Sequence, residues 1–194
     1  MPSLPYNPET VLGEVLGRRA LKGFDPSATA FQCPFIQQPC LKRSKQLADN
    51  EPYPVCTLWQ RSDEAVSPEE NLIFVCPKRF YAVDFLKEVV DHCWPGEKPK
   101  NPRVAPEVKM ADFGNVDFVI ADVSADGEID QFLSVELQAI DITGSAFPAY
   151  QALRASSDLT KRPTYNFNWD NVYKRYVTQL IRKGYFHHHW KSKI

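Results

Sequence analysis

Two apolar runs, at residues 115–123 and 131–142, place the strongest constraint on the fold because a short polar segment at 124–130 separates them. Each run has the length and the β-branched and aromatic content of a β-strand. The polar segment contains Asp126-Gly127, a pair that favours the tight turns of hairpins. The pattern therefore predicts an antiparallel β-hairpin in the C-terminal half of the chain.

Acidic residues interrupt both predicted strands. Asp117 stands between Val116 and Phe118 in the first strand, and the two-residue period puts Glu136 and Gln138 on one face of the second. Pairing would bring the two carboxylates together, where each raises the pKa of the other and a divalent cation relieves the repulsion. Carboxylate oxygens suit Mg²⁺, which can polarise a phosphate and activate a water. The alternative is an exposed strand face with ordinary polar residues.

Helical periodicity appears at the start, in the middle and at the end of the chain. We expect a short opening helix from Asn7 to near Gly17, a helix over 80–94, an exposed connection over 97–106 and a last helix over 170–183. The last helix is expected to bury the face that carries Val172, Tyr176, Val177, Leu180 and Ile181. The expected fold class is α/β, in the sense of an α+β protein with a mixed sheet.

Length and hydropathy limit the class of protein. A chain of 194 residues with 43% hydrophobic content can bury one substantial core. We find neither an apolar run of membrane-spanning length nor the charged and apolar regions of a secretory signal. The expectation is a cytoplasmic protein without a membrane partner.

Residues 30–77 are rich in proline and polar side chains and carry four of the five cysteines. We expect this loop-rich part to need a stabilising cross-link. The four are Cys33, Cys40, Cys56 and Cys76. Thiols in a reducing compartment are either buried or bound to metal, and the unequal spacing of these four leaves both readings open. The fifth, Cys93, lies beside His92 on a helix flank and is expected to be a packed thiol.

The formal net charge of -1 gives no overall attraction to a polyanion. Basic residues nevertheless cluster, notably Lys42 with Arg43, and Lys174 with Arg175 on the polar side of the last helix. Convergence of such clusters on one cleft would indicate contacts to DNA phosphates. Each cluster taken alone is equally explained by a solvated surface or a salt bridge.

Three segments of the chain, taken together and in this order, resemble the NotI-type restriction endonucleases, from about Asn7 to Gly184. The first segment comprises Cys33-Pro34-Phe35, Cys40-x-Lys42, Val55-Cys56 and Val75-Cys76-Pro77-x-Arg79. The second comprises Asp117-Phe118-x-x-Ala121 and the run from Val135-Glu136-Leu137-Gln138-Ala139 to Gly144-Ser145. The third is Asn171-Val172-Tyr173-Lys174-Arg175 with Gln179.

This resemblance implies a PD-(D/E)XK nuclease core that cuts double-stranded DNA with Mg²⁺. By similarity, Asp117 and Glu136 would bind the metal, and Gln138 would occupy the third catalytic position, where most nucleases of this fold have lysine. Because glutamine does not ionise, it could orient water or substrate but could not act as a charged acid or base. The four cysteines of residues 30–77 would hold a structural iron or zinc, since tetrahedral thiolate ligation suits either metal.

The resemblance also predicts the organisation of the chain. We expect an N-terminal helical segment (1–29), a four-cysteine metal-binding lobe (30–79) and the nuclease core (80–194), packed as one compact unit. A homodimer would match a palindromic DNA site. Members of the family are longer and continue with a further core strand after the last helix, so we expect a missing C-terminal segment or a partner chain. The alternatives are a truncated, inactive relative that still binds metal and DNA or protein, and a non-specific defence or repair nuclease.

Overall fold

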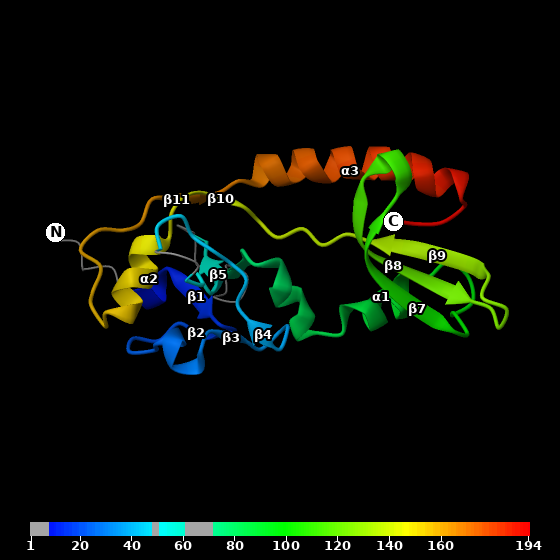
Figure 1. Ribbon diagram of the computed structural model, residues 1–194. Coiled ribbons are helices and arrows are strands. Elements are labelled where there is room, and N and C mark those ends of the chain that lie inside the picture. The colour runs from blue at the N-terminus through cyan, green and yellow to red at the C-terminus, as the bar shows by residue number, and fades with distance from the viewer. Residues whose placement is uncertain (1–7, 48–50, 61–71) are drawn as a thin grey trace. The chain divides into compact units, whose positions relative to one another are not determined.

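A computed structural model describes residues 8–47, 51–60 and 72–194. Its fold is of mixed α and β type, and its sheets are antiparallel (Figure 1). The chain divides into two compact units, of which the first comprises residues 1–82 with 139–169 and the second 83–138 with 170–194. The chain therefore returns to the first unit after its central hairpin. This division differs from the single compact unit expected from the sequence, because residues 139–169 pack with the N-terminal part.

The first unit is built on a four-stranded sheet in the order β2-β1-β5-β6. Its strands are β1 (Leu12–Val15), β2 (Arg18–Arg19), β5 (Val55–Trp59) and β6 (Leu72–Phe74). The prediction of an opening helix is wrong. A short 3-10 helix, η1 (Pro8–Thr10), is followed by β1, which pairs with β5 over Leu12–Leu58 and Val15–Val55. This pairing with a distant strand outweighs the local helical spacing of the same apolar residues.

One buried cluster of side chains joins that sheet to helix α2 (Phe147–Arg154). Val15 and Leu58 from the sheet and Tyr150 and Leu153 from the helix are fully buried in it. The described residues of this unit also form the 3-10 helices η2 (Pro26–Thr29) and η4 (Pro77–Ala82), the hairpin of β3 (Gln32–Cys33) with β4 (Gln38–Pro39), and the pair of β10 (Ile142–Gly144) with β11 (Tyr165–Phe167).

The buried hydroxyl of Tyr150 is unusual in this core. Its ring packs edge-on against Tyr53 with centroids 5.2 Å apart, but its hydroxyl is buried with no hydrogen-bond partner among the described residues. Burying a polar group without a partner costs free energy. We therefore expect Tyr150→Phe to raise the free energy of unfolding by about 1 kcal/mol. Urea denaturation of the two proteins would measure this, and a destabilised variant would contradict it.

The second unit contains a three-stranded sheet in the order β7-β8-β9. The predicted hairpin is confirmed, since β8 (Asn115–Val123) and β9 (Ile129–Val135) pair antiparallel around the Asp126-Gly127 turn. The exposed connection expected over 97–106 is partly wrong, because residues from 102 onward form strand β7 (Pro102–Lys109). β7 is an edge strand, where the missing N–H groups of Pro102 and Pro106 are tolerated.

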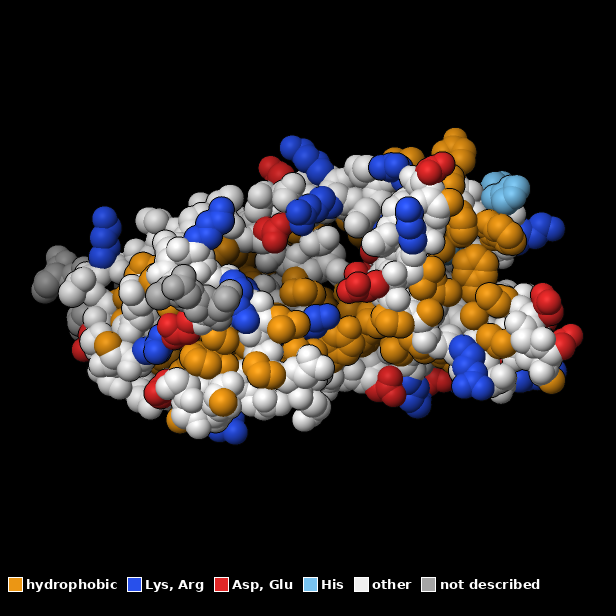
Figure 2. All heavy atoms as spheres, viewed as in Figure 1, with side chains coloured by type: hydrophobic (Ala, Val, Ile, Leu, Met, Phe, Trp, Pro, Cys, Tyr) orange, Lys and Arg blue, Asp and Glu red, His pale blue; other side chains and the backbone are white. Residues whose placement is uncertain are grey.

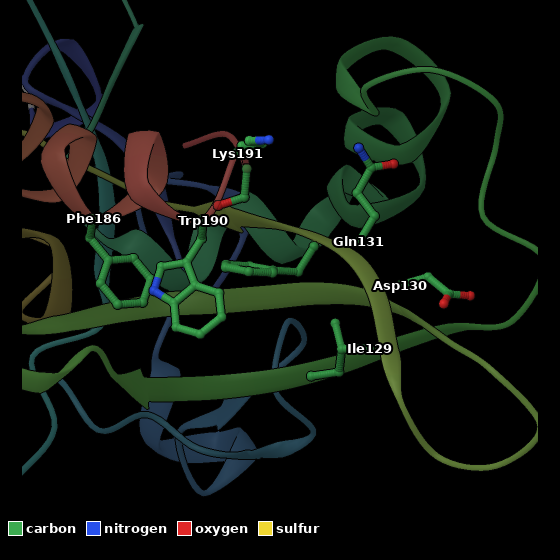
Figure 3. A pocket seen from close by; sticks show the side chains of 8 residues that line it. Ile129, Asp130, Gln131, Phe186, Trp190 and Lys191 are labelled. Carbon is green, nitrogen blue, oxygen red and sulfur yellow. The ribbon is translucent and has the colours of Figure 1, made fainter.

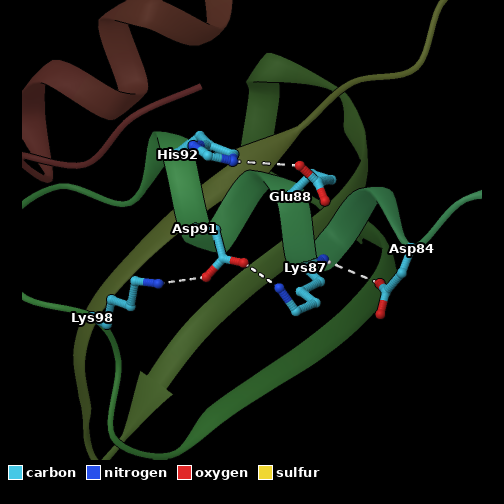
Figure 4. Close-up of polar contacts among 6 residues, drawn as sticks. All are labelled: Asp84, Lys87, Glu88, Asp91, His92 and Lys98. Carbon is cyan, nitrogen blue, oxygen red and sulfur yellow. Dashed lines mark hydrogen bonds and ion pairs between the residues drawn. The ribbon is translucent and has the colours of Figure 1, made fainter.

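Helix α1 (Phe85–Cys93) precedes this sheet, and Phe85 packs against Phe118 of β8 with ring centroids 5.5 Å apart. Asp84 caps the helix by accepting a hydrogen bond from the Lys87 backbone N–H at 3.1 Å. Figure 4 shows Asp91 between the ammonium groups of Lys87 and Lys98, and this pair of contacts lowers the pKa of Asp91 to about 2. These contacts cap the start of α1 and tie it to Lys98, which follows the helix.

Helix α3 (Trp169–His189) is longer than predicted and continues past Gly184. Its expected apolar face is partly wrong, because Tyr176, Val177 and Ile181 are more than half exposed. The buried positions are instead Lys183 and His187, one turn apart. After α3, the Lys193 carbonyl accepts a hydrogen bond from Ser134 of β9 at 2.8 Å, and Lys193 bridges Leu133 in parallel. The short 3-10 helix η5 (Ala111–Phe113) completes the unit.

Candidate functional site

Asp117 lies on β8 between the buried residues Val116 and Phe118 and is itself half-buried. Because strand side chains alternate, its carboxylate faces away from that buried pair. The antiparallel register pairs Phe118 with Val135, so the next step along both chains sets Asp117 opposite Glu136. The Asp117 Oδ2 atom also accepts a hydrogen bond from the Leu137 N–H at 2.7 Å. This bond fixes the carboxylate beside the end of β9.

Glu136 follows the last residue of β9 rather than lying within the strand as predicted. Strand alternation therefore does not govern the direction of its side chain. Its carboxylate is nevertheless close to that of Asp117, and the pKa of Glu136 is raised both by the negative charge of Asp117 and by the hydrogen bond that protonated Glu136 donates to it. Burial is the largest cause of this raised pKa, and an ion pair with Lys183 opposes it. The structure thus brings together the two acids singled out in the sequence.

Lys183 is a neighbour of the two acids that the sequence did not reveal. It projects from α3, its side chain is only 5% exposed, and its ammonium contacts Glu136 Oε1. The same ammonium donates to the carbonyl oxygen of Asn115 at 2.5 Å. One signal was available, since Lys183 lies three residues after Leu180 and four before His187 and so shares a helix face with them. A lysine on such a face is ordinarily taken to be solvated.

Gln138, the third predicted site residue, lines a different feature. It forms an open pocket of about 500 Å³ with Lys174, Arg175, Thr178 and Gln179 of α3. Neither Asp117 nor Glu136 is among the residues that line this pocket. The side chains of Lys174 and Arg175 are exposed, and Figure 2 shows basic side chains over the first half of α3. The pocket therefore joins an amide side chain to two cations in the same unit as the acids.

The four cysteines of the predicted metal lobe lie in the first unit as free thiols. Cys33, Cys40 and Cys56 are buried, and Cys76 is half-buried. Burial raises the pKa of Cys40 and raises that of Cys56 to about 12, and the neighbouring charge of Cys76 contributes to both shifts. The hairpin segment with Cys33 and Cys40 therefore lies near the segments that carry Cys56 and Cys76. In the described chain, no three His, Cys, Asp or Glu side chains form a group able to hold a metal ion.

Lys42, predicted to contact DNA, has its ammonium inside this cysteine-bearing region. The ammonium donates to the carbonyl oxygens of Val55 at 2.8 Å and Val75 at 3.0 Å, and it lies 5.5 Å from the ring centroid of Tyr53. Burial lowers the pKa of Lys42, and the charges of nearby thiolates would oppose this effect. Its neighbour Arg43 donates to the Cys40 carbonyl at 2.6 Å. Both side chains thus bond to the backbone of the cysteine segments.

A second pocket of the same unit as the acids has aromatic walls (Figure 3). Phe186 lies in the last turn of α3, and Trp190 directly follows the helix. Their ring centroids are 6.1 Å apart, and both rings face Ile129 of β9. The pocket measures about 560 Å³, and Lys191 and Asp130 lie at its edge. None of these residues was singled out in the sequence.

Comparisons of the chain with protein-family models, with curated proteins and with solved structures found no match. Among the described residues, no helix is both long enough and apolar enough to cross a membrane.

Proposed function

We propose that this chain is a nuclease subunit of the PD-(D/E)XK type that hydrolyses phosphodiester bonds of double-stranded DNA with Mg²⁺. The observation that carries the proposal is the meeting of Asp117 and Glu136 across the β8–β9 hairpin. Two carboxylates in contact and partly withdrawn from water repel each other. A protein gains by such an arrangement when a cation is to be bound there.

The donor set fits Mg²⁺. This ion is commonly held by one or two carboxylates, and it completes its octahedron with waters and substrate phosphate oxygens. When bound, it would polarise the phosphate and lower the pKa of a bound water. Asp117 and Glu136 would be its ligands, and the Leu137 N–H sets the orientation of Asp117. Two carboxylates suffice for this ion, so a third protein ligand is not required.

The order of elements also supports a nuclease core. In the second unit, α1 is followed by the three strands β7, β8 and β9 and then by α3. The resemblance implies one further core strand after the last helix. Lys193, which bridges Leu133 in parallel beyond α3, lies where such a strand would join β9.

Binding of DNA would involve the pocket of Gln138, Lys174 and Arg175. Cationic side chains beside an amide can contact phosphate oxygens and position a duplex. We further propose a two-fold dimer, in which each subunit cuts one strand of a palindromic site. The roles of Lys42 and Arg43 at DNA stay predictions, because their present contacts are to the backbone of the first unit.

A DNA digest tests the proposal. Long double-stranded DNA is incubated with the protein and Mg²⁺, beside an EDTA control, the variant Glu136→Gln and the matched variant Glu128→Gln in the exposed hairpin turn. We expect discrete fragments from the wild type and Glu128→Gln, and a loss of at least about 100-fold in cleavage rate from Glu136→Gln. A smear in place of bands would favour a non-specific nuclease. Intact DNA, or equal cleavage by Glu136→Gln, would refute the mechanism.

One observation favours a second candidate. Glu136 already pairs with the Lys183 ammonium, which occupies one of its oxygens. A relative that had lost catalysis while keeping its fold and its DNA- or protein-binding surface would also have such a pair. Retarded migration of DNA by the protein without any cleavage in Mg²⁺ or Mn²⁺ would select this candidate over the nuclease.

A structural iron or zinc in the cysteine region remains a proposal from the resemblance. As arranged, the thiols of Cys33, Cys40, Cys56 and Cys76 do not form a group that holds a metal ion. Burial also favours the neutral thiol over the thiolate that a metal requires. No step of the proposed reaction therefore depends on such a centre, and metal analysis of the purified protein would decide whether one exists.

A further inference from the structure

Asp117 and Glu136 form a pair of like charges, and Lys183 lies against one of them. Asp117 lies near the start of β8 and Glu136 just after the end of the neighbouring β9, so their two negative charges repel each other. The ammonium of Lys183 forms an ion pair with Glu136. Because the ammonium lies against Oε1, it favours the charged carboxylate and holds that oxygen in one direction.

The surroundings of Lys183 make this contact a fixed one. The residue is 4% exposed and faces the sheet from the buried side of α3. Its second bond, to the Asn115 carbonyl, reaches the first residue of β8, two positions before Asp117. The ammonium thus ties the start of one strand to the acid that follows the other. Lys183 of α3 therefore holds Glu136 directly and Asp117 through the strand that carries it.

Stability alone is a poor explanation for a buried lysine at this position. Withdrawing an ammonium and a carboxylate from water carries a large desolvation cost. Replacing such a pair with apolar residues of similar volume is often neutral or stabilising. A charge here is therefore better explained by what it does to Glu136.

We propose that Lys183 is a positioning residue of the acid site. It fixes Glu136 beside Asp117 and offsets one of their two negative charges, so the site is assembled before a phosphate approaches. This inference rests on the proposed nuclease function. It also gives the site a charged third member from α3, whereas Gln138 is uncharged and lines the separate pocket.

The test compares Lys183→Met with Lys183→Gln, which keeps an N–H donor, and with Lys183→Arg, which keeps the charge. Arg182→Met is the matched control, because Arg182 is exposed on the same helix turn and donates a hydrogen bond to the nearby Asp112 carbonyl at 3.1 Å. Two quantities are measured on folded protein. These are the rate of DNA cleavage in Mg²⁺ and the affinity for Mn²⁺ without DNA, with Glu136→Gln as the reference for lost metal binding.

The two measurements should move in opposite directions. Without the ammonium, the neutral variants should bind Mn²⁺ about 3–10-fold more tightly, because a like charge no longer repels the ion. Their kcat should fall about 100-fold, with little change in KM, because Glu136 is no longer held in place. Lys183→Arg should bind Mn²⁺ like the wild type and recover part of kcat. Arg182→Met should match the wild type in both.

Other patterns would overturn the inference. Unchanged cleavage by both neutral variants would show that the site does not need Lys183. Weaker Mn²⁺ binding together with slower cleavage would show a purely structural role, since the site would have collapsed. If the wild type bound Mn²⁺ through Glu136 but cut no DNA, the proposed function would fail while the Mn²⁺ affinities still tested Lys183. If the wild type bound no Mn²⁺, the inference would fail with the site.

Discussion

Replacing Lys183 with methionine is expected to lower the free energy of unfolding of the second unit by about 3–5 kcal/mol. The substitution leaves Glu136, whose side chain is 18% exposed, without its cation in a partly dehydrated place. It also removes the donor to the Asn115 carbonyl. Methionine has nearly the same length as lysine, so packing against β8 and β9 changes little. Hydrogen exchange of the β8 amides would report the loss in this unit alone.

The double variant makes this prediction specific to the ion pair. Glu136→Gln removes the charge that Lys183→Met leaves unpaired, so the two losses should not add. We expect the double variant to lose at least about 1.5 kcal/mol less than the sum of the single variants. Arg182→Met serves as the control and should stay within about 0.5 kcal/mol of the wild type. Additive losses would mean that the two side chains do not depend on each other.

The hairpin could be predicted from sequence because two local signals agree. A two-residue apolar period marks the strands, and Asp126-Gly127 marks the turn between them. Together they predict the pairing of the two strands, and the observed register pairs Phe118 with Val135, the neighbours of Asp117 and Glu136. The end of β9 could not be predicted in the same way. The strand stops at Val135, and the Leu137 N–H bonds to the Asp117 carboxylate.

Long-range pairing explains the errors at the N-terminus and in the proline-rich connection. Val11, Leu12, Val15 and Leu16 have helical spacing, but β1 forms because β5 offers it a partner forty residues further along the chain. The prolines of residues 97–106 indicated an exposed connection. An edge strand tolerates them equally well, and β7 pairs with β8 on its other side. Neither partner is visible in a local window of sequence.

Lys183 escaped prediction for a related reason. The apolar residues of α3 suggested that Tyr176, Val177 and Ile181 face the core, and the structure exposes all three. The buried face is set by what lies opposite on the sheet, and there the acid Glu136 accepts a lysine. The partner of a charged residue depends on the tertiary structure, so residue type and spacing alone do not reveal it.

Replacing Lys42 with methionine is expected to lower the free energy of unfolding of the first unit by about 2–3 kcal/mol. The ammonium joins two strand segments by bonding to the carbonyl oxygens immediately before Cys56 and Cys76, and its own chain leads to Cys40. Its loss leaves both oxygens without their charged donor. The Val75 amide, which donates to the Cys56 carbonyl at 3.0 Å, should exchange its hydrogen faster in the variant.

Lys42→Met also distinguishes two roles of Lys42. In the first, which we call a clamp, its ammonium holds the Val55 and Val75 carbonyls together; in the second, it contacts DNA. Lys45 is exposed in the same segment, so Lys45→Met removes an equal charge without touching the two carbonyl oxygens. If Lys42 is a clamp, Lys42→Met should speed Val75 exchange and change DNA affinity no more than Lys45→Met does. If Lys42 contacts a phosphate, DNA affinity should fall while exchange stays at the wild-type rate, because a surface contact to DNA adds nothing to the unbound fold. The geometry favours the clamp, since both bonds of the ammonium point inward to the backbone of β5 and of the segment after β6.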